Sequence, residues 1–431
     1  MFSKYIQPYL SPRVLPLFLL GIASGLPLAL SGGTFQAWAT VSDVSLQQIG
    51  FLTLVGMAYT FKFLWAPFID RYVPPFMGRR RGWMALTQLG LALTLVLMGL
   101  LNPAEHLLLL ALLATFLAFL SATQDIAFDA YSTEVLQTEE RAAGAAIRTL
   151  GYRVGMIISG GLALIIAPLW LGWGGTYMFM GLIMATCAVV SFLAPEPNEV
   201  QKPRSLEDAF VLPFKEFFSR PEAWALLLLI VLYKLGDAFA GALSTTFLIR
   251  GAGFEPELIG TVNKILAVIA TILGALVGGS LMSQWGTYRA LMIFGLLQAV
   301  SNFGYYVVAM FPGNVPIMAL AVGVENICGG LGTAAFVALV MGLCDVRYTA
   351  TQFALLTALA SVGRVFLAGP LTPPLVEAFG WPTFYLLTVL IALPGLFLLW
   401  LYRERIKRID DNNLQDKERE EPQDEALVLE K

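Results

Sequence analysis

Residues 106–131 read HLLLLALLATFLAFLSATQDIAFDAY, an apolar run that is interrupted by Asp125 and Asp129 near its end. Its length is close to the roughly 20 residues that cross a ~30 Å hydrocarbon core as a helix. Similar runs recur along nearly the whole chain of 431 residues, which is 57% hydrophobic and only 13% charged. A soluble domain has about 25% charged residues. We therefore expect an all-α polytopic membrane protein.

The apolar runs predict twelve transmembrane helices. They do not show the alternation of about 10-residue segments that is typical of a membrane β-barrel. The expected spans are residues 14–36, 47–69, 83–101, 106–131, 144–167, 174–194, 222–247, 257–281, 289–310, 315–343, 350–376 and 382–402.

Lysine and arginine gather in the loops on one side of these spans. That side has Arg71, Arg79, Arg80, Arg81, Arg141, Lys202, Arg204, Lys215, Arg220, Arg289, Arg347, Arg403, Arg405, Lys407 and Arg408. The opposite loops have almost none, and Arg250, which borders the seventh span, is the exception. The positive-inside rule then places both termini in the cytoplasm.

Short matches at offsets of about 208–211 residues point to an internal repeat. Gly172-Trp173 recurs as Gly380-Trp381, Arg153-Val154 as Arg364-Val365, and Ile49-Gly50 as Ile259-Gly260. We therefore expect a six-helix half over residues 1–194, a cytoplasmic linker over 195–221, a second six-helix half over 222–402, and a charged, disordered tail over 403–431. Two parallel six-helix halves around a central cavity resemble the major facilitator architecture, in which substrate binds near the bilayer midplane.

The loop after the second span, DRYVPPFMGRRR at 70–81, resembles the cytoplasmic signature of major facilitator transporters. Its charges could pair with a neighbouring helix when the cytoplasmic side is closed. We therefore name Asp70, Arg71, Arg79 and Arg80 as gating candidates. The alternative is a plain positive-inside anchor.

Longer fragments resemble the AmpG family of muropeptide permeases. They include GIASGLPLALSGGTFQAW (21–38), KFLWAPFIDRYVPPFMGRRRGW (62–83), SATQDIAFDAY (121–131), AGAAIRTLGYRVGMIISGGLAL (143–164), LYKLGDAFAGALSTTFLIRGAGF (232–254), ENICGGLGTAAFVALVMGLC (325–344) and TQFALLTALASVGRVF (351–366). The resemblance implies a proton-coupled symporter of the bacterial inner membrane. It would import GlcNAc-1,6-anhydroMurNAc peptides from the periplasm for peptidoglycan recycling, a process that in this family influences β-lactamase induction and so antibiotic resistance.

Ten charged residues lie inside the apolar spans, where each costs at least ~2.5–3.5 kcal/mol on insertion scales. They are Lys62, Asp125, Asp129, Arg148, Arg153, Lys234, Asp237, Lys264, Glu325 and Arg364. Such residues usually face a polar pathway or a ligand site.

The four carboxylates, Asp125, Asp129, Asp237 and Glu325, are our candidates for proton coupling. Asp125 and Asp129 are four residues apart and share one helix face, where two like charges cannot easily both ionise. They could equally form permanent ion pairs with Lys62, Arg148 or Arg153. Glu325 is either a second proton site or the counter-ion of Arg364.

Cations outnumber anions in the spans, which suits an anionic substrate such as a peptide stem with carboxylates. Because Arg can bind a carboxylate bidentately, Arg153 and Arg364 are our first choices as substrate contacts. Lys62 and Lys264 are alternatives, and each of these cations could instead be a structural partner. Lys234 lies three residues before Asp237, so the two form either a neutralised pair or a switch that substrate or a proton opens.

Sugars are bound by aromatic faces and amide side chains. Among such groups near the charged residues we select Gln36, Trp38, Tyr59, Gln124, Tyr233 and Asn326 as further substrate contacts. The alternative for the aromatic residues is packing or interface anchoring.

Several other classes of protein fit the sequence poorly. His106 is the only histidine, the three cysteines are spread over apolar segments, and no GxxxxGK[ST] motif occurs. We expect no enzyme activity, metal site, cofactor, nucleic-acid partner or ATPase subunit, and a proton gradient as the energy source. The remaining alternative is a secondary transporter of another amphipathic anion, such as a peptide or siderophore.

Overall fold

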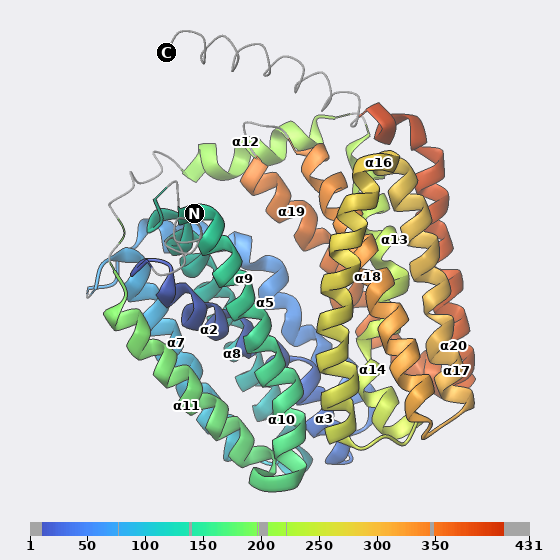
Figure 1. Cartoon of the computed structure of the whole chain (residues 1–431), viewed down its shortest axis with the longest axis horizontal. Coiled ribbons are helices and arrows are strands. Elements are labelled where there is room, and N and C mark those ends of the chain that lie inside the picture. Colours follow the sequence, from blue (N-terminus) through green and yellow to red (C-terminus); the bar gives the residue numbers. More distant parts are fainter. Residues whose placement is uncertain are drawn as a thin grey trace, which may run out of the picture.

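The computed structural model describes residues 11–75, 77–137, 140–195, 197, 206–220, 222–344 and 349–408. Within these ranges the regular structure is helical. Residues 198–205 of the expected linker and 409–431 of the expected tail lie outside them, as do the side chains of Asp70 and Lys264. Figure 1 shows two helical bundles side by side.

The first bundle is built from the helices before the linker. They are α2 (Leu15–Ser31), α3 (Gly33–Val41), α4 (Leu46–Leu52), η2 (Thr53–Gly56), α5 (Met57–Phe61), η3 (Lys62–Leu64), α6 (Ala66–Arg71), α7 (Arg79–Gly99), α8 (Pro103–Glu134), α9 (Arg141–Ile157), η5 (Ile158–Leu162), α10 (Ala163–Ile166), η6 (Ala167–Leu171) and α11 (Gly172–Leu193). In its packing, α2 lies against α9, and α7 lies against both α8 and α11.

The second bundle repeats this plan. It contains α13 (Ala223–Ala242), α14 (Ser244–Thr246), η7 (Phe247–Gly251), α15 (Pro256–Leu258), η8 (Ile259–Leu266), α16 (Ala267–Ser301), α17 (Phe303–Met310), α18 (Val315–Leu343), α19 (Thr349–Val362), η10 (Gly363–Ala368) and α20 (Gly369–Leu401). Here α16 packs on α18, and α13 packs on α20. We refer to the two bundles as the N-terminal and C-terminal halves.

The helices accommodate the twelve expected crossings. Nine continuous helical segments of the described chain are long and apolar enough to cross a membrane. Two of them, 143–193 and 352–401, have about 50 residues. A straight helix of that length would span about 75 Å, so each holds two crossings. The expected second span is the broken series α4 to α6, which the nine do not include.

The internal repeat is visible in the backbone. Gly172 and Gly380 have φ values of 68° and 73° and form the turns within the two 50-residue segments. Gly78 and Gly286, at φ 74° and 75°, mark another pair of turns with the same 208-residue offset. Only glycine adopts this left-handed region at little cost. The repeated Gly-Trp motif therefore marks equivalent turns in the two halves.

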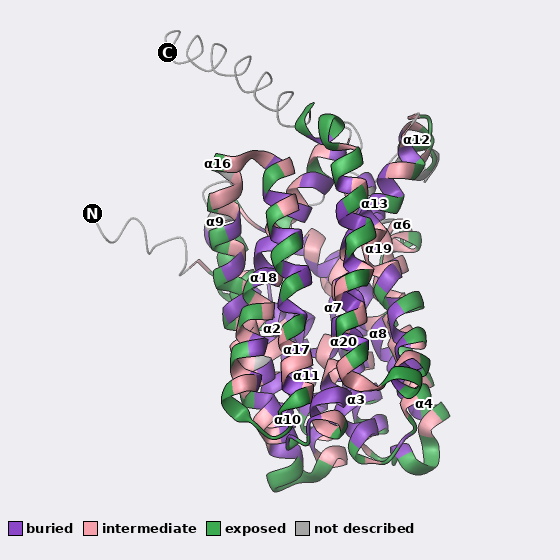
Figure 2. Cartoon of the chain, turned by 90° about the vertical axis from the view of Figure 1, so that its right-hand side faces the viewer, coloured by how far each residue is buried: buried purple, intermediate pink, exposed green. Residues whose placement is uncertain are grey.

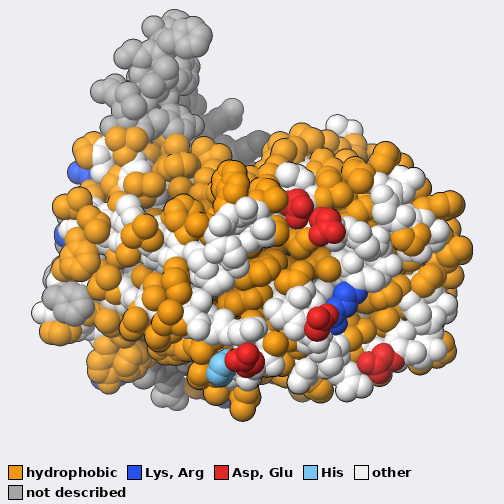
Figure 3. Space-filling view, turned by 90° about the horizontal axis from the view of Figure 1, so that it is seen from below, with side chains coloured by type: hydrophobic (Ala, Val, Ile, Leu, Met, Phe, Trp, Pro, Cys, Tyr) orange, Lys and Arg blue, Asp and Glu red, His pale blue; other side chains and the backbone are white. Residues whose placement is uncertain are grey.

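The outer faces of both halves are apolar. Large side chains such as Leu108, Trp170 and Leu193 are more than 75% exposed, and exposed residues lie along the outside of the bundles in Figure 2. Apolar groups also dominate the end opposite the termini, where Lys and Arg are sparse (Figure 3). The apolar outer faces of the two bundles fit a hydrocarbon environment.

The two halves lie close together at the end opposite the chain termini and diverge towards the other end (Figure 1). Backbones approach closely at two crossings near the closed end. A Cβ atom added to Gly260 would lie 2.6 Å from the carbonyl oxygen of Gly161, and one added to Gly50 would lie 2.8 Å from that of Gly369. Both crossings need glycine, and they are related by the repeat.

One helix in the linker was not anticipated by the sequence analysis. This helix, α12 (Leu206–Phe218), lies across the open end in Figure 1. It packs on α19, and the ring of its Phe214 lies 6.2 Å from that of Phe63 in the N-terminal half. The linker therefore contacts both halves.

Candidate functional site

A cavity of about 590 Å³ lies between the halves, within the usual range for small-molecule sites. Helices of both halves form its walls. Each half contributes lining residues with polar side chains. They are Ser31, Gln36, Thr53, Tyr59, Thr60 and Arg153 from the N-terminal half and Ser244, Thr245, Asn263, Thr271, Tyr305, Glu325, Asn326, Ser361 and Arg364 from the C-terminal half.

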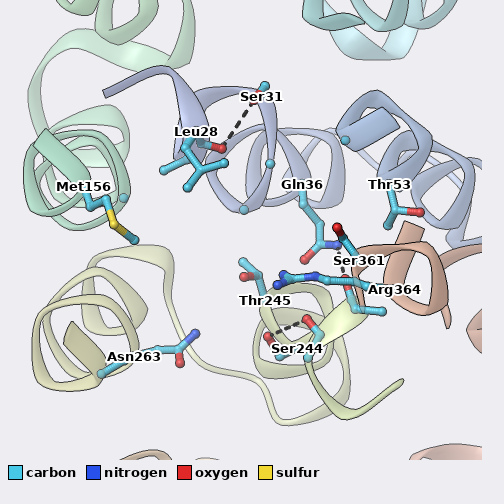
Figure 4. Close-up of a pocket in the computed structure, with 18 of the residues that line it drawn as sticks. Leu28, Ser31, Gln36, Thr53, Met156, Ser244, Thr245, Asn263, Ser361 and Arg364 are labelled. Carbon is cyan, nitrogen blue, oxygen red and sulfur yellow. Dashed lines mark hydrogen bonds between the residues drawn. The ribbon is translucent and has the colours of Figure 1, made fainter. Parts of the chain in front are cut away.

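Among the residues that the structure describes, three charged side chains line this cavity: Arg153, Arg364 and Glu325. The two arginines come from opposite halves, on α9 and on the π-helical segment η10, at positions that the repeat makes approximately equivalent. Figure 4 shows the Arg364 side chain extending into the pocket towards Thr245. The described lining therefore has two cations and one anion, which favours an anionic ligand.

Arg364 has no counter-ion within salt-bridge distance among the residues that the structure describes. Its charge interacts with those of Glu325 and Asp237 at longer range. Glu325 instead accepts a hydrogen bond from the amide of Asn326 at 2.6 Å. The guanidinium of Arg364 can therefore bind an external carboxylate without first breaking a short ion pair.

Amide and hydroxyl groups form much of the remaining polar wall. Gln36 donates from Nε2 to the carbonyl of Ala242 in the other half at 2.9 Å, and Thr271 donates to Asn326 Oδ1 at 3.2 Å. The Tyr59 hydroxyl lies 3.3 Å from that of Ser31. These groups suit the hydroxyls of a sugar.

Most charges of the N-terminal half lie outside the cavity lining. Asp125 accepts a hydrogen bond of 2.5 Å from Ser24, and Lys62 is near enough for its charge to act on Asp125. Asp129 forms an ion pair with Arg148, which also donates to Ser132 at 2.7 Å. Two of our proton-coupling candidates are thus bound to partners within their own half.

Lys234 and Asp237 form an ion pair of 3.6 Å in the C-terminal half. Gln298 donates a further hydrogen bond to Asp237, and the Lys234 ammonium lies 5.4 Å from the ring centre of Phe336. Neither residue lines the cavity. The pair sits behind its wall, because the Asp237 charge still acts on Glu325.

The predicted amide and aromatic contacts divide into two groups. Gln36, Tyr59 and Asn326 line the cavity. Trp38 stacks on Trp173 in the apolar core, and Tyr233 packs on Phe336 and donates to the Leu291 carbonyl. Gln124 is also buried away from the cavity lining.

The gating candidates lie at the open end. Arg80 forms an ion pair of 2.6 Å with Glu134 at the end of α8, and Arg79 lies 3.8 Å from the same carboxylate. Arg71 is exposed. The Arg80 contact joins two helices of the N-terminal half, so in this conformation it does not bridge the halves.

The hydroxyl residues Ser31, Thr53, Ser244, Thr245 and Ser361 of the lining were missed by the sequence analysis. Serine and threonine in membrane helices commonly bond to their own backbone, as Ser361 does to Ala358. The sequence alone therefore does not indicate that these serine and threonine residues line a cavity. Across the described part of the chain, no group of three His, Cys, Asp or Glu side chains could hold a metal ion.

Comparison with known proteins agrees with this architecture. The family model of the Major Facilitator Superfamily matches residues 17–368 and 265–423. The chain belongs to this superfamily. Its helices and cavity are those of a polytopic membrane transporter and not of an enzyme.

Two curated relatives cover almost the whole chain. The anhydromuropeptide permease of Escherichia coli K12 is 54% identical over 415 residues, which are 96% of this chain and 84% of the relative. The putative transporter AmpG 4 of Rickettsia felis is 31% identical over 94% of this chain and 99% of its own length. The chain is therefore a member of the AmpG family within the superfamily.

Solved structures share the fold at low sequence identity. A bacterial homologue of the lysosomal transporter Spinster, in an inward-facing and unoccupied conformation, has a TM-score of 0.73 at 17% identity and covers 94% of this chain and 98% of its own. The D-xylose–proton symporter has a TM-score of 0.69 at 15% identity, with 90% and 97% covered. These likenesses concern the fold alone.

Proposed function

We propose that this protein imports anhydromuropeptides from the periplasm to the cytoplasm in symport with protons. The observation that carries the proposal is the 54% identity to the Escherichia coli anhydromuropeptide permease over 96% of the chain. The cavity supports it, since its cationic and hydroxyl-rich walls match a ligand that combines carboxylates with a sugar.

In this proposal the peptide stem lies near the two arginines. Arg364 and Arg153 bind stem carboxylates through charge-assisted, bidentate hydrogen bonds. Gln36, Asn326, Tyr59 and the hydroxyl residues of the wall contact the disaccharide. Lys62 and Lys234 shape the electric field around the cavity, and Trp38, Tyr233 and Gln124 support its walls.

Glu325 is the proton site that we favour among the four carboxylates, because it alone of them lines the cavity. Its protonation removes the negative charge beside Arg364 and changes which state of the transporter is favoured. Asp125, Asp129 and Asp237 assist through the charge networks in which they take part.

Alternating access then follows from motion of the N-terminal half against the C-terminal half. We place both termini in the cytoplasm of a bacterial inner membrane, from the loop charges. The conformation described here is then closed to the periplasm and open to the cytoplasm. The Asp70–Arg80 loop and Glu134 act at the cytoplasmic gate.

Uptake of labelled anhydromuropeptide into right-side-out membrane vesicles tests the proposal. We expect accumulation that depends on the imposed proton gradient and disappears with an uncoupler. Vesicles without the protein are the control. If labelled muropeptide does not accumulate while a labelled peptide or siderophore does, the cargo proposed here is wrong.

A further inference from the structure

Arg250 is the one basic residue that the loop-charge pattern leaves unexplained, because it lies on the side where lysine and arginine are sparse. Arg250 is the second-last residue of η7 (Phe247–Gly251) in the C-terminal half. Its guanidinium reaches across to the N-terminal half. Nη1 donates to the carbonyl of Val44 at 2.7 Å, and Nη2 donates to the carbonyl of Thr40 at 2.6 Å.

One acceptor, the Thr40 carbonyl, belongs to the last turn of α3 (Gly33–Val41), and the other, the Val44 carbonyl, lies in the turn just beyond the helix. The last carbonyls of a helix have no partners within it, and this end of a helix carries a partial negative charge that favours cations. The turn after α3 is held by Asp43, which has a φ of 59°. Arg250 therefore completes the cap of a helix that belongs to the other half.

Two further contacts lie beside this one. Gln36 donates to the Ala242 carbonyl at 2.9 Å, and the hydroxyls of Thr40 and Thr246 lie 3.0 Å apart. Like the Arg250–Val44 bond, each joins residues 206 positions apart in the sequence. This is close to the repeat offset, so approximately equivalent segments of the two halves meet here.

These contacts lie at the end where the cavity is closed. Gln36 and Ala242 are part of the cavity lining, whereas Thr40 and Thr246 are buried beyond it. Any state that is open at this end must separate the two segments and so break the Arg250 bonds. The Thr40 and Val44 carbonyls would then lose their charged partner.

We propose that Arg250 is a positioning residue for the transport cycle, which holds the side opposite the chain termini closed by capping α3 across the two halves. The inference rests on the proposed alternating-access function. It assigns a role to a residue outside the cavity and independent of the identity of the cargo.

The test measures opening at this end without any substrate. A single cysteine is placed in the cavity as Ser244→Cys, after Cys187, Cys328 and Cys344 have been replaced by Ala, and is labelled by a charged thiol reagent added outside right-side-out vesicles. Hydrogen bonds to a charged group are stronger than those between neutral groups. The loss of two should therefore raise the fraction of molecules that are open at this end by about 10-fold or more. We therefore expect Arg250→Ala to raise the labelling rate by about 10-fold.

Matched variants separate this role from general destabilisation. Arg405→Ala removes an arginine of the same half that pairs with Glu222 at 3.3 Å, far from the closed end, and should label like the parent. Arg250→Lys keeps the charge and should lie between the parent and Arg250→Ala. Thr246→Val breaks only the neighbouring hydroxyl contact and should give a smaller increase. It remains informative if Arg250→Ala does not fold.

Transport kinetics give a second readout. A larger outward-open population lowers the apparent KM for cargo added outside, while slower closure lowers kcat. If the labelling rate is unchanged in both Arg250→Ala and Thr246→Val, these contacts do not hold this end closed, and the proposal is wrong whichever cargo is transported. Increased labelling of Arg250→Ala, together with no muropeptide uptake by the unsubstituted protein, would support the role of Arg250 and reject the cargo.

Discussion

The two halves share a backbone plan but use their charged residues differently. In the N-terminal half, Asp125 and Asp129 are bound by Ser24 and Arg148 and do not line the cavity. In the C-terminal half, Glu325 and Arg364 both face it. A repeat can therefore preserve helix packing while the carboxylate that lines the cavity comes from one half. We infer that the C-terminal half carries most of the proton coupling, whereas both halves contribute to substrate recognition.

The largest effect on substrate binding is expected from Arg364→Ala. Loss of a charge-assisted contact to substrate costs about 1.5–3 kcal/mol, so the KM for muropeptide should rise about 10- to 100-fold. Arg148→Gln removes an arginine from the N-terminal ion pair instead, and its KM should change by less than about 3-fold on the same scale. Initial uptake rates over a range of substrate concentrations measure both. Equal effects of the two variants would contradict the distinction between an arginine that lines the cavity and one that is paired outside it.

The next effect concerns stability rather than binding. Glu134 is bound by Arg80 at 2.6 Å, and both side chains are almost fully buried. Removal of one partner from a buried pair costs about 3–5 kcal/mol. Glu134→Gln should therefore lower the thermal unfolding midpoint of the detergent-solubilised protein clearly.

The matched variant in the second half of the chain is Glu216→Gln. Glu216 pairs with Arg220 at 2.8 Å, but both side chains are over 20% exposed, and a pair in contact with water contributes about 1 kcal/mol or less. Its unfolding midpoint should fall less. A larger fall of the midpoint in Glu216→Gln than in Glu134→Gln would show that burial does not determine how much these ion pairs contribute to stability.

A smaller effect is expected at Tyr233. Its hydroxyl donates to the Leu291 carbonyl at 3.0 Å inside the C-terminal core, so Tyr233→Phe removes one neutral hydrogen bond worth about 1 kcal/mol. Unfolding should shift slightly and the KM for muropeptide should not change. A large rise in KM would instead make Tyr233 a substrate contact.

The smallest effect depends on pH and lies outside the membrane. Ser11 donates to Glu140 at 2.6 Å, and this hydrogen bond holds the pKa of Glu140 below its usual range, with the Gln137 backbone and Arg13 contributing less. A lowered pKa in the folded state stabilises the protein above the unfolded pKa of about 4.3, and this contribution disappears as pH falls through the lowered value.

Ser11→Ala should accordingly be less stable than the parent at pH 7, and the difference should shrink below about pH 4. Unfolding midpoints across this range measure it. Glu140→Gln removes the titrating group and serves as the control. A difference between Ser11→Ala and the parent that grows towards low pH would have the wrong sign.

The fold was predictable because the sequence features that determine it extend over many residues. Twenty-residue apolar runs and Gly-Trp turns at a fixed offset depend on local chemistry that a single sequence displays. The helix α12 was not anticipated, since its polar, Pro-containing surroundings resemble a plain linker. The broken second span was expected as a continuous helix because its 3₁₀ stretches carry no distinctive composition.

The site was harder to predict than the fold. The sequence identifies the charged residues within transmembrane helices but not the direction in which their side chains point. Arg153, Arg364 and Glu325 line the cavity, whereas Lys62, Lys234 and Asp237 do not, although all six lie within apolar runs. Trp38 and Tyr59 also have similar neighbours in the sequence, yet only Tyr59 lines the cavity. The direction depends on how helices such as α3, α5, α9, α13 and α18 pack against their neighbours, which periodicity alone does not determine.

Comparison of Glu325→Gln with Asp125→Asn in the same vesicles tests the central claim most directly. Both proton-driven accumulation and gradient-independent exchange of labelled muropeptide are measured. We expect Glu325→Gln to exchange substrate but to lose accumulation, and Asp125→Asn to retain most of both. Loss of accumulation in Asp125→Asn, with accumulation intact in Glu325→Gln, would place the coupling site in the N-terminal half and contradict the account.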